Sequence, residues 1–266
     1  MDILSIFGYL GALMVGIILG LIGRGGSILT VPILVYLIGL NPVTATAYSL
    51  FIVGASSLVG AWPKYKQGFV NLKTAIIFGI PSIAAVFATR KFLVPAIPNE
   101  IGSIGGLMIT KSLLMMMLFA VLMVAASFSM IRSKSSKETE SEGEQKFNYP
   151  MILLEGALVG VLTGLVGAGG GFLYVPALVL WANIPMKKAV GTSLIIVTIN
   201  SLIGFMGDVQ TLDIEWGFLL IFTLISILGI ILGVFLSKFV SGPKLKKSFG
   251  LFVLIMAIYI IFKELK

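Results

Sequence analysis

A glycine-dense segment occurs twice in this chain and constrains its fold more than any other feature. The first copy runs from Gly16 to Pro32 and the second from Gly160 to Pro176, which is an offset of about 144 residues without a gap. Each copy has an apolar stretch, a run of glycines and a short apolar stretch that contains Val-Pro. A repeat at half the chain length is typical of the pseudo-symmetric architecture of secondary transporters.

The composition indicates an integral membrane protein. Hydrophobic residues make up 58% of the 266 residues, charged residues only 11%, and the mean hydropathy is +1.09. Several apolar runs reach the length needed to cross a bilayer, so we expect the lipid bilayer to surround the chain. The formal net charge of +8 comes from Lys and Arg that lie mostly between these runs. This placement favours a role in membrane orientation and predicts no nucleic-acid partner.

The residue types that are missing exclude several kinds of chemistry. The chain contains no Cys and no His. Without them there is no disulfide, no thiolate metal site, no Ser-His catalysis and no histidine proton relay. We therefore predict that the protein is not an enzyme, binds no metal and carries no cofactor.

The hydropathy pattern predicts ten apolar segments. They are expected at residues 3–22, 28–40, 43–62, 72–89, 104–131, 151–166, 172–181, 189–206, 216–239 and 248–262. The first segment follows no basic region, so we expect a retained span and not a signal peptide. Segments 28–40 and 172–181 are too short to cross as ordinary helices and are expected to be broken, tilted or re-entrant.

The expected domain organisation follows the repeat. Residues 1–131 form the first transmembrane repeat, 132–148 a polar linker and 149–266 the second repeat, and both repeats belong to one bundle. The linker is rich in Ser, Lys and Glu and cannot bury a core, so it is expected to be a mobile loop on the cytoplasmic side.

Two topologies are compatible with these segments. If the short segments cross the membrane there are ten spans, and an odd number per repeat makes the halves inverted; if they loop back there are eight spans and the repeats are parallel. With ten spans and the N-terminus outside, most Lys and Arg lie on the cytoplasmic side, whereas eight spans divide them nearly equally. The positive-inside rule therefore favours an all-α integral membrane protein with two inverted repeats of five spans. Arg90, Lys91, Lys111, Lys263 and Lys266 then stay outside, the first two in a loop.

The glycine runs are the first candidate binding elements. Consecutive glycines free the backbone from helical geometry and expose amide groups at the start of the next short helix, where partial positive charge attracts anions. The alternative is close helix packing, which we favour for Gly16, Gly20, Gly160 and Gly164. The residues expected to contact a substrate are Gly25, Gly26 and Ser27 in the first break and Gly169, Gly170 and Gly171 in the second.

Arg24 is the single cation within the first break. An arginine buried in a membrane is costly and is usually paired or functional, and its planar guanidinium suits an oxyanion. Arg24 is therefore a substrate-binding candidate, with an interfacial anchor at the cytoplasmic side as the alternative.

A cluster of hydroxyl and amide side chains follows each short segment. Tyr48 and Ser49 occupy this place in the first half, and Thr192, Ser193 and Asn200 in the second. Such groups can donate hydrogen bonds to an oxyanion, so all five are candidate substrate ligands. The alternative is hydrogen bonding between helices, which Ser and Thr often provide in membranes.

Few carboxylates lie near the predicted spans. Glu155 lies just inside segment 151–166, and Asp208 follows segment 189–206. Either can carry a coupling proton, and the alternative for both is a position at the membrane interface.

At these residues the chain resembles the TauE/SafE family of bacterial sulfite and organosulfonate exporters. The resemblance rests on Gly16, Gly20, Gly23-x-Gly-Gly and Val31-Pro32, on the second copy Gly160, Gly164, Gly167-Ala-Gly-Gly-Gly171 and Val175-Pro176, and on Ala189-Val-Gly-Thr-Ser-Leu194. It implies a permease of the bacterial inner membrane for small sulfite-like or sulfonate-like anions. In the first copy, Arg24 and Ser27 stand where the family has small residues.

The leading hypothesis is therefore a transporter of sulfite, thiosulfate or an organosulfonate that works by alternating access between inverted halves. Export is what the resemblance implies. An anion channel and a permease for another small solute or a cation are the alternatives, while the absence of His, Cys and paired membrane carboxylates argues against an intramembrane enzyme. A homodimer is compatible with the sequence.

Overall fold

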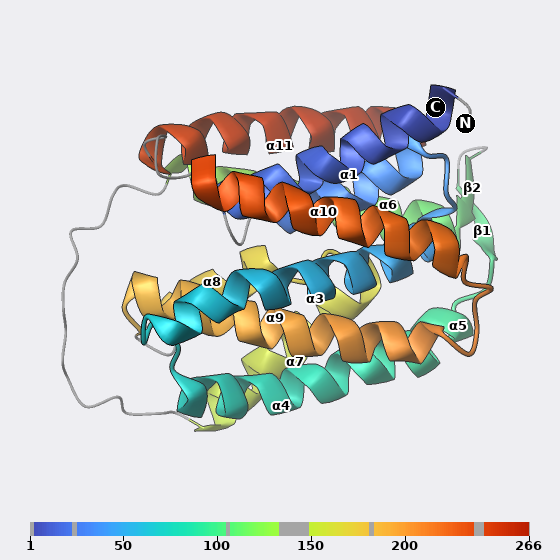
Figure 1. Ribbon diagram of the computed structural model, residues 1–266. Helices are drawn as coiled ribbons and strands as arrows, with labels where there is room; N and C mark the ends of the chain where they lie inside the picture. The colour runs from blue at the N-terminus through green and yellow to red at the C-terminus, as the bar shows by residue number, and fades with distance from the viewer. Residues whose placement is uncertain are drawn as a thin grey trace.

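The computed structural model describes residues 3–22, 26–104, 107–132, 149–180, 184–236 and 242–265. These residues form a bundle of long helices that lie roughly side by side (Figure 1). The long helices are α1 (Ile3–Ile22), α3 (Pro42–Lys66), α4 (Leu72–Ala88), α6 (Lys111–Arg132), α7 (Tyr149–Val166), α9 (Met186–Asp208), α10 (Trp216–Leu236) and α11 (Gly242–Glu264). Each long apolar segment expected from the sequence overlaps one of these helices.

Short helical segments stand at both places where the sequence predicts them. In the first half they are η1 (Gly26–Leu29), α2 (Thr30–Pro32) and η2 (Ile33–Leu37), which follow one another without a break. In the second half there is a single short helix, α8 (Gly171–Leu180). Val31, Leu34, Tyr174 and Val175 are all buried, so both short segments belong to the interior of the bundle.

The structure corrects two expectations in the region after α4. The loop expected at Arg90 is absent, because α4 continues through the wide turn η3 (Thr89–Leu93) into α5 (Val94–Ala96). The first residues of segment 104–131 are not helical: together with the residues just before them they form a hairpin of antiparallel strands, β1 (Glu100–Ile104) and β2 (Leu107–Thr110). We call the end of the bundle that carries this hairpin the hairpin end, and the other end the opposite end (Figure 1).

Glycines bring α1 and α10 into backbone contact. Gly16 lies against Gly229, and Gly20 against Gly233, so closely that a Cβ on any of the four would collide with the other helix. The pairing proceeds in the same direction along both helices, which are therefore parallel. Small residues at such spacing allow helix backbones in membranes to approach closely.

The helices α4 and α7 repeat this arrangement. Gly160 faces the backbone of Ser82, and Gly164 faces Thr89, so these two helices are also parallel. The packing role predicted for Gly16, Gly20, Gly160 and Gly164 is confirmed. Because α7 matches α1 and α10 matches α4 at the repeat offset, the two contacts are equivalent, and each joins a helix of one half to a helix of the other.

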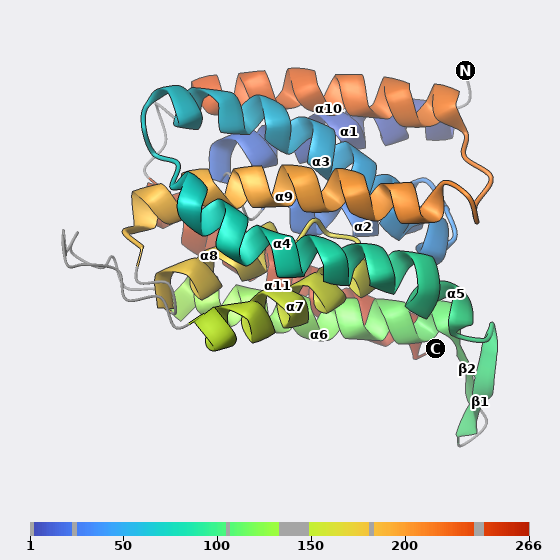
Figure 2. The same cartoon turned by 90° about the horizontal axis from the view of Figure 1, so that it is seen from below.

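The helices α1, α3 and α4 run opposite to their counterparts α7, α9 and α10 in the other half. In Figure 1, α1 and α10 run away from the hairpin end, whereas α4 and α7 run toward it. The counterparts α3 and α9 pack together antiparallel, since Gly54 contacts Leu202 and Phe51 contacts Phe205. Seen from below, α9 lies between α3 and α4 (Figure 2).

The outer surface of the bundle is apolar. Five of the described helical segments are long and apolar enough to cross a membrane, at residues 42–66, 72–96, 111–132, 188–208 and 216–236. Large side chains on α10 such as Leu224, Leu228 and Ile231 are more than half exposed. Exposed apolar surface on this scale fits a multi-pass membrane protein whose outer faces contact lipid.

Candidate functional site

A small cavity lies where the two short segments meet. Its volume is about 10 Å³, close to the space that one water molecule needs. It is lined by Leu19, Ser27, Ser57, Gly171, Ser193, Leu194 and Val197. Ser27 and Gly171 are counterparts at the repeat offset, so equivalent points of the two halves face the same space. An apolar wall with a few polar groups is typical of a small-molecule site.

Three serines supply the polar side chains of the cavity. Ser27 belongs to the first turn of η1, Ser57 to α3 and Ser193 to the second turn of α9. Ser193 donates its hydroxyl proton to the carbonyl oxygen of Val190 at 2.9 Å, which leaves its oxygen as an acceptor. Ser27 Oγ is buried and has no hydrogen-bond partner among the residues that the structure describes. Its hydroxyl is therefore a donor available to a ligand.

The glycine turn in the second half brings the start of α8 to the cavity. Gly167, Gly169 and Gly170 have φ values of 73°, 67° and 66°, a conformation that side chains disfavour. This turn carries the chain from the end of α7 into α8, whose first residue is the cavity-lining Gly171. The first amides of a helix have no acceptor within it and carry partial positive charge, so this wall suits an anion.

A second polar cluster lies about two turns beyond Ser193 along α9. Asn200 Nδ2 donates to Ser82 Oγ at 2.7 Å and also to the hydroxyl oxygen of Tyr174. The hydroxyl groups of Ser82 and Tyr174 also form a hydrogen bond with each other, with their oxygens 2.7 Å apart. These three buried side chains tie α9 to α4 and α8. The role that the structure gives Asn200 is a hydrogen bond between helices, although its Oδ1 has no partner in the described part of the chain.

The other predicted hydroxyl ligands lie outside the cavity lining. Tyr48 accepts a hydrogen bond from the Glu215 amide at 2.7 Å, and Thr192 accepts one from the Asn71 amide at 2.9 Å. Both therefore hold a loop against a helix. Ser49 is fully buried, and its hydroxyl has no partner within the described residues.

The first glycine break is only partly described. Arg24 and Gly25 lie outside the described residues, and Gly26 is the first residue of η1. Their predicted contact with a substrate stays a prediction. Ser57 lines the cavity but was not among the predicted ligands; its place on α3, after Ser49, is the signal that could have pointed to it.

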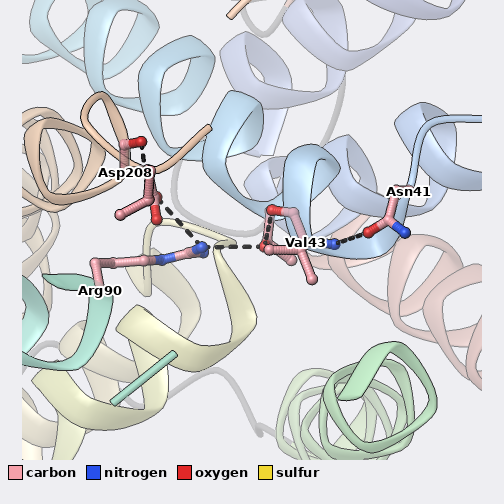
Figure 3. Close-up of polar contacts among 6 residues, drawn as sticks. Asn41, Val43, Arg90 and Asp208 are labelled. Atoms are coloured by element: carbon pink, nitrogen blue, oxygen red, sulfur yellow. Dashed lines mark hydrogen bonds and ion pairs between the residues drawn. The ribbon is translucent and has the colours of Figure 1, made fainter. Parts of the chain in front are cut away.

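The two predicted coupling carboxylates have different surroundings. Glu155 is buried on α7, and neither of its carboxylate oxygens meets a hydrogen-bond partner among the described residues. Asp208, at the end of α9, lies 3.3 Å from Arg90 Nη1 (Figure 3). The same nitrogen donates to Thr46 Oγ1 at 3.2 Å. The position of Asp208 is thus inside the bundle, and its partner Arg90 is the residue expected in a loop.

The described residues hold no group of three or more His, Cys, Asp or Glu side chains that could bind a metal ion. The polar groups near the cavity are hydroxyls, an amide side chain and helix-end amides. This set can bind and orient a small anion and offers no nucleophile–base pair.

Comparisons with known proteins agree with this description. A family model described as "Sulfite exporter TauE/SafE" matches residues 9–260. A probable membrane transporter protein of Xylella fastidiosa (strain 9a5c) is 32% identical over 258 residues, which cover 94% of this chain and 92% of that protein. A probable membrane transporter protein of Bacillus subtilis (strain 168) is 28% identical, over 77% of this chain and 78% of its own length. One of Methanocaldococcus jannaschii is 37% identical over 41% of this chain and 43% of its own. No solved structure matches the chain.

Proposed function

The chain belongs to the TauE/SafE family of sulfite exporters, and we propose that it carries a small sulfur-containing oxyanion across the cytoplasmic membrane. Membrane transport follows from the family and from relatives described as probable membrane transporters. Sulfite, thiosulfate or an organosulfonate as the cargo is our proposal. The observation that carries it is the cavity shared by Ser27 and Gly171, the same position in each repeat.

We further propose that the bundle is a pair of inverted repeats with ten membrane segments. The opposite directions of α1 and α7, and of α4 and α10, support this arrangement. The charges support an orientation. Lys64 and Lys66 lie at the opposite end, whereas Asp213 and Glu215 lie at the hairpin end. By the positive-inside rule, the opposite end and linker 132–148 are cytoplasmic.

The size of the cavity supports transport by alternating access. A volume of about 10 Å³ is too small for a sulfur oxyanion, which has four or more heavy atoms, so the cavity must widen before a substrate enters. Because Ser27 begins one short segment and Gly171 the other, separating these two segments opens the site. Movement of one group of helices against another about a central site is the mechanism of many such transporters.

The roles we assign follow from the placements. Ser27 donates its hydroxyl proton to the anion, and the amides at the start of α8 supply partial positive charge. Ser57 and Ser193 complete the polar wall. Arg24, Gly25 and Gly26 come directly before Ser27 in the chain, so the proposal places them beside the anion. Of the two coupling candidates, Glu155 has the unpaired carboxylate and is the one we propose to carry a proton.

The test compares two buried serine variants, Ser27→Ala and Ser56→Ala. Ser56 is as buried as Ser27 and also lacks a partner among the described residues, but it does not line the cavity. A hydrogen bond to a charged ligand contributes about 1.5–3 kcal/mol, so Ser27→Ala should weaken anion binding about 10- to 100-fold. Ser56→Ala should bind as the wild type does.

Binding is measured as the rise in unfolding temperature with sulfite, thiosulfate, sulfate, taurine or chloride, since a ligand of the folded state must stabilise it. Transport is measured as uptake into proteoliposomes. A sulfur oxyanion that stabilises the wild type and saturates its own uptake supports the proposal. If the two variants bind the anion equally well, the cavity is not its binding site. Uptake that does not saturate would favour a channel.

A further inference from the structure

A second group of buried charges lies at the hairpin end, away from the cavity lining. Contacts join Thr46 from the first turns of α3, Arg90 from η3 and Asp208 from the end of α9. Lys111, at the start of α6, is near enough to Arg90 and Asp208 to interact with both charges. Arg90 is 0% exposed, Asp208 1% and Lys111 8%. Four helices thus converge on a polar spot inside an otherwise apolar bundle.

The hydrogen-bonding capacity of Arg90 is mostly unused. Only Nη1 has partners, namely Thr46 Oγ1 and Asp208 Oδ2, while Nε and Nη2 are buried without a partner among the described residues. The Nη1–Oδ2 distance of 3.3 Å also exceeds the roughly 2.7–2.9 Å expected of a charge-assisted hydrogen bond. A guanidinium next to a carboxylate normally pairs through two nitrogens, and here it does not (Figure 3).

The charges in this group do not balance. Arg90 and Lys111 carry two positive charges and Asp208 one negative charge, and Lys111 interacts electrostatically with both other residues. The neighbouring Lys91 is exposed, and its ammonium group lies over the rings of Phe87 and Phe92. A buried net positive charge is costly unless an anion joins it.

We propose that Arg90 and Lys111 form a second anion site, in which the transported oxyanion competes with the Asp208 carboxylate for the positive charge of the guanidinium. The Nε and Nη2 groups, which Asp208 does not contact, offer a planar pair of donors that matches two oxygens of a sulfur oxyanion. This inference rests on the proposed function because it assumes the same anion. It assigns Asp208 the role of a built-in competitor that holds the site when no substrate is present.

The site is connected to the central cavity through one turn of chain. Thr46, which accepts the hydrogen bond from Arg90, packs against Gly167 with no room for a Cβ between them. Gly167 begins the glycine turn that ends at Gly171, on the cavity wall. One packed turn of chain thus joins the cavity wall to the residue that Arg90 contacts, and the second site lies on the side of the cavity toward the hairpin end.

The repeat does not reproduce this site at the opposite end. At the repeat offset, Arg90 corresponds to Val234 and Asp208 to Lys64. Neither a guanidinium nor a carboxylate is present there, so the second site belongs to one end of the transporter alone. With the second site at one end only, an anion that enters from that side of the membrane meets a binding site that an anion entering from the other side does not.

The test uses Asp208→Asn, Lys111→Met and the matched control Lys91→Met, each made in the wild type and in Ser27→Ala. The probes are sulfite and thiosulfate, and the readout is the anion concentration at half-maximal thermal stabilisation. Removing the competing carboxylate should lower this concentration threefold or more, whereas Lys111→Met should raise it about tenfold, equivalent to about 1.4 kcal/mol. Lys91→Met should leave it unchanged.

The outcomes separate the second site from the proposed function. A wild type that no sulfur oxyanion stabilises contradicts the proposed function itself. A wild-type response that Ser27→Ala abolishes completely, with Asp208→Asn no tighter than the wild type, overturns only the second site. A residual response in Ser27→Ala that disappears on adding Lys111→Met supports it. If Asp208→Asn fails to fold, the test compares Lys111→Met with Lys91→Met. The same anion concentration at half-maximal stabilisation in both variants overturns the second site.

Discussion

The contact between α1 and α10 predicts that alanine at Gly229 destabilises the protein. A Cβ added at Gly229 would lie 2.5 Å from the carbonyl oxygen of Leu13 and 2.9 Å from Gly16 Cα, whereas ordinary contacts begin at 3.4 Å. The helices must therefore separate by about 0.9 Å at this point, because both obstacles are backbone atoms that no rotamer change can move. Every neighbouring contact along the pair loosens as a result.

The magnitude follows from two opposing effects. Overpacking of a close contact costs about 1–3 kcal/mol, and the better helix propensity of alanine returns up to about 1 kcal/mol. The net destabilisation is about 1–2 kcal/mol, which lowers the unfolding temperature by roughly 2–8 °C for a chain of this size. Tryptophan fluorescence of the detergent-purified protein during heating measures it.

Gly217→Ala is the matched control in the same helix. Nothing lies within 4 Å of a Cβ added at Gly217, so only the propensity gain applies there. Its unfolding temperature should equal or exceed that of the wild type. If Gly229→Ala melts at the same temperature as Gly217→Ala, α1 and α10 do not pack through their glycines, and the paired-helix reading of the repeat is refuted.

Three further outcomes are expected. The chain has no Cys, so single cysteines at Gln67 and Ser103, both exposed and at different ends of the bundle, should react with an impermeant maleimide from opposite faces of the membrane; reaction from one face would contradict the crossing bundle. Gly170→Ala should cost at least about 1 kcal/mol more stability than Gly39→Ala, because both have positive φ but only Gly170 lacks room for a Cβ; equal melting temperatures would exclude a packing role. Tyr174→Phe should lower stability by about 1–3 kcal/mol by leaving buried partners unsatisfied, and an unchanged melting curve would count against the cluster.

The glycine pattern made most of the fold predictable. Glycines four residues apart on an apolar run anticipate close helix pairs, and Gly16 and Gly160 occupy such contacts. The bounds of α1 and the shortness of α8 also follow from the apolar runs. Hydropathy does not predict the β1–β2 hairpin, because β1 lies almost entirely before the apolar run 104–131 and β2 lies within its first residues, where hydropathy alone does not separate a strand from a helix.

The site was less predictable because a polar side chain in a membrane protein can either line a binding site or form a hydrogen bond between elements of the fold. Ser27 lines the cavity, whereas Tyr48 and Thr192 bond to backbone amides of distant loops. A sequence shows that a hydroxyl needs a partner and does not show which backbone group comes near it. Arg90 was placed in a loop for a related reason: a cation ends an apolar run, and its pairing with Asp208 depends on the packing of η3 against α9.

The residues that the repeats do not share determine how the two ends of the bundle behave. If the halves were identical, conformations open at either end would have equal free energies, because exchanging the halves would interconvert them. At the repeat offset Arg90 corresponds to Val234, so the Arg90–Asp208 ion pair has no equivalent made of the same residue types at the opposite end. If transport follows the alternating access proposed above and opening the hairpin end breaks this ion pair, the two conformations differ in free energy and their populations are unequal. In that case the charges that the repeats do not share, and not the shared glycine contacts, decide which end is open more often.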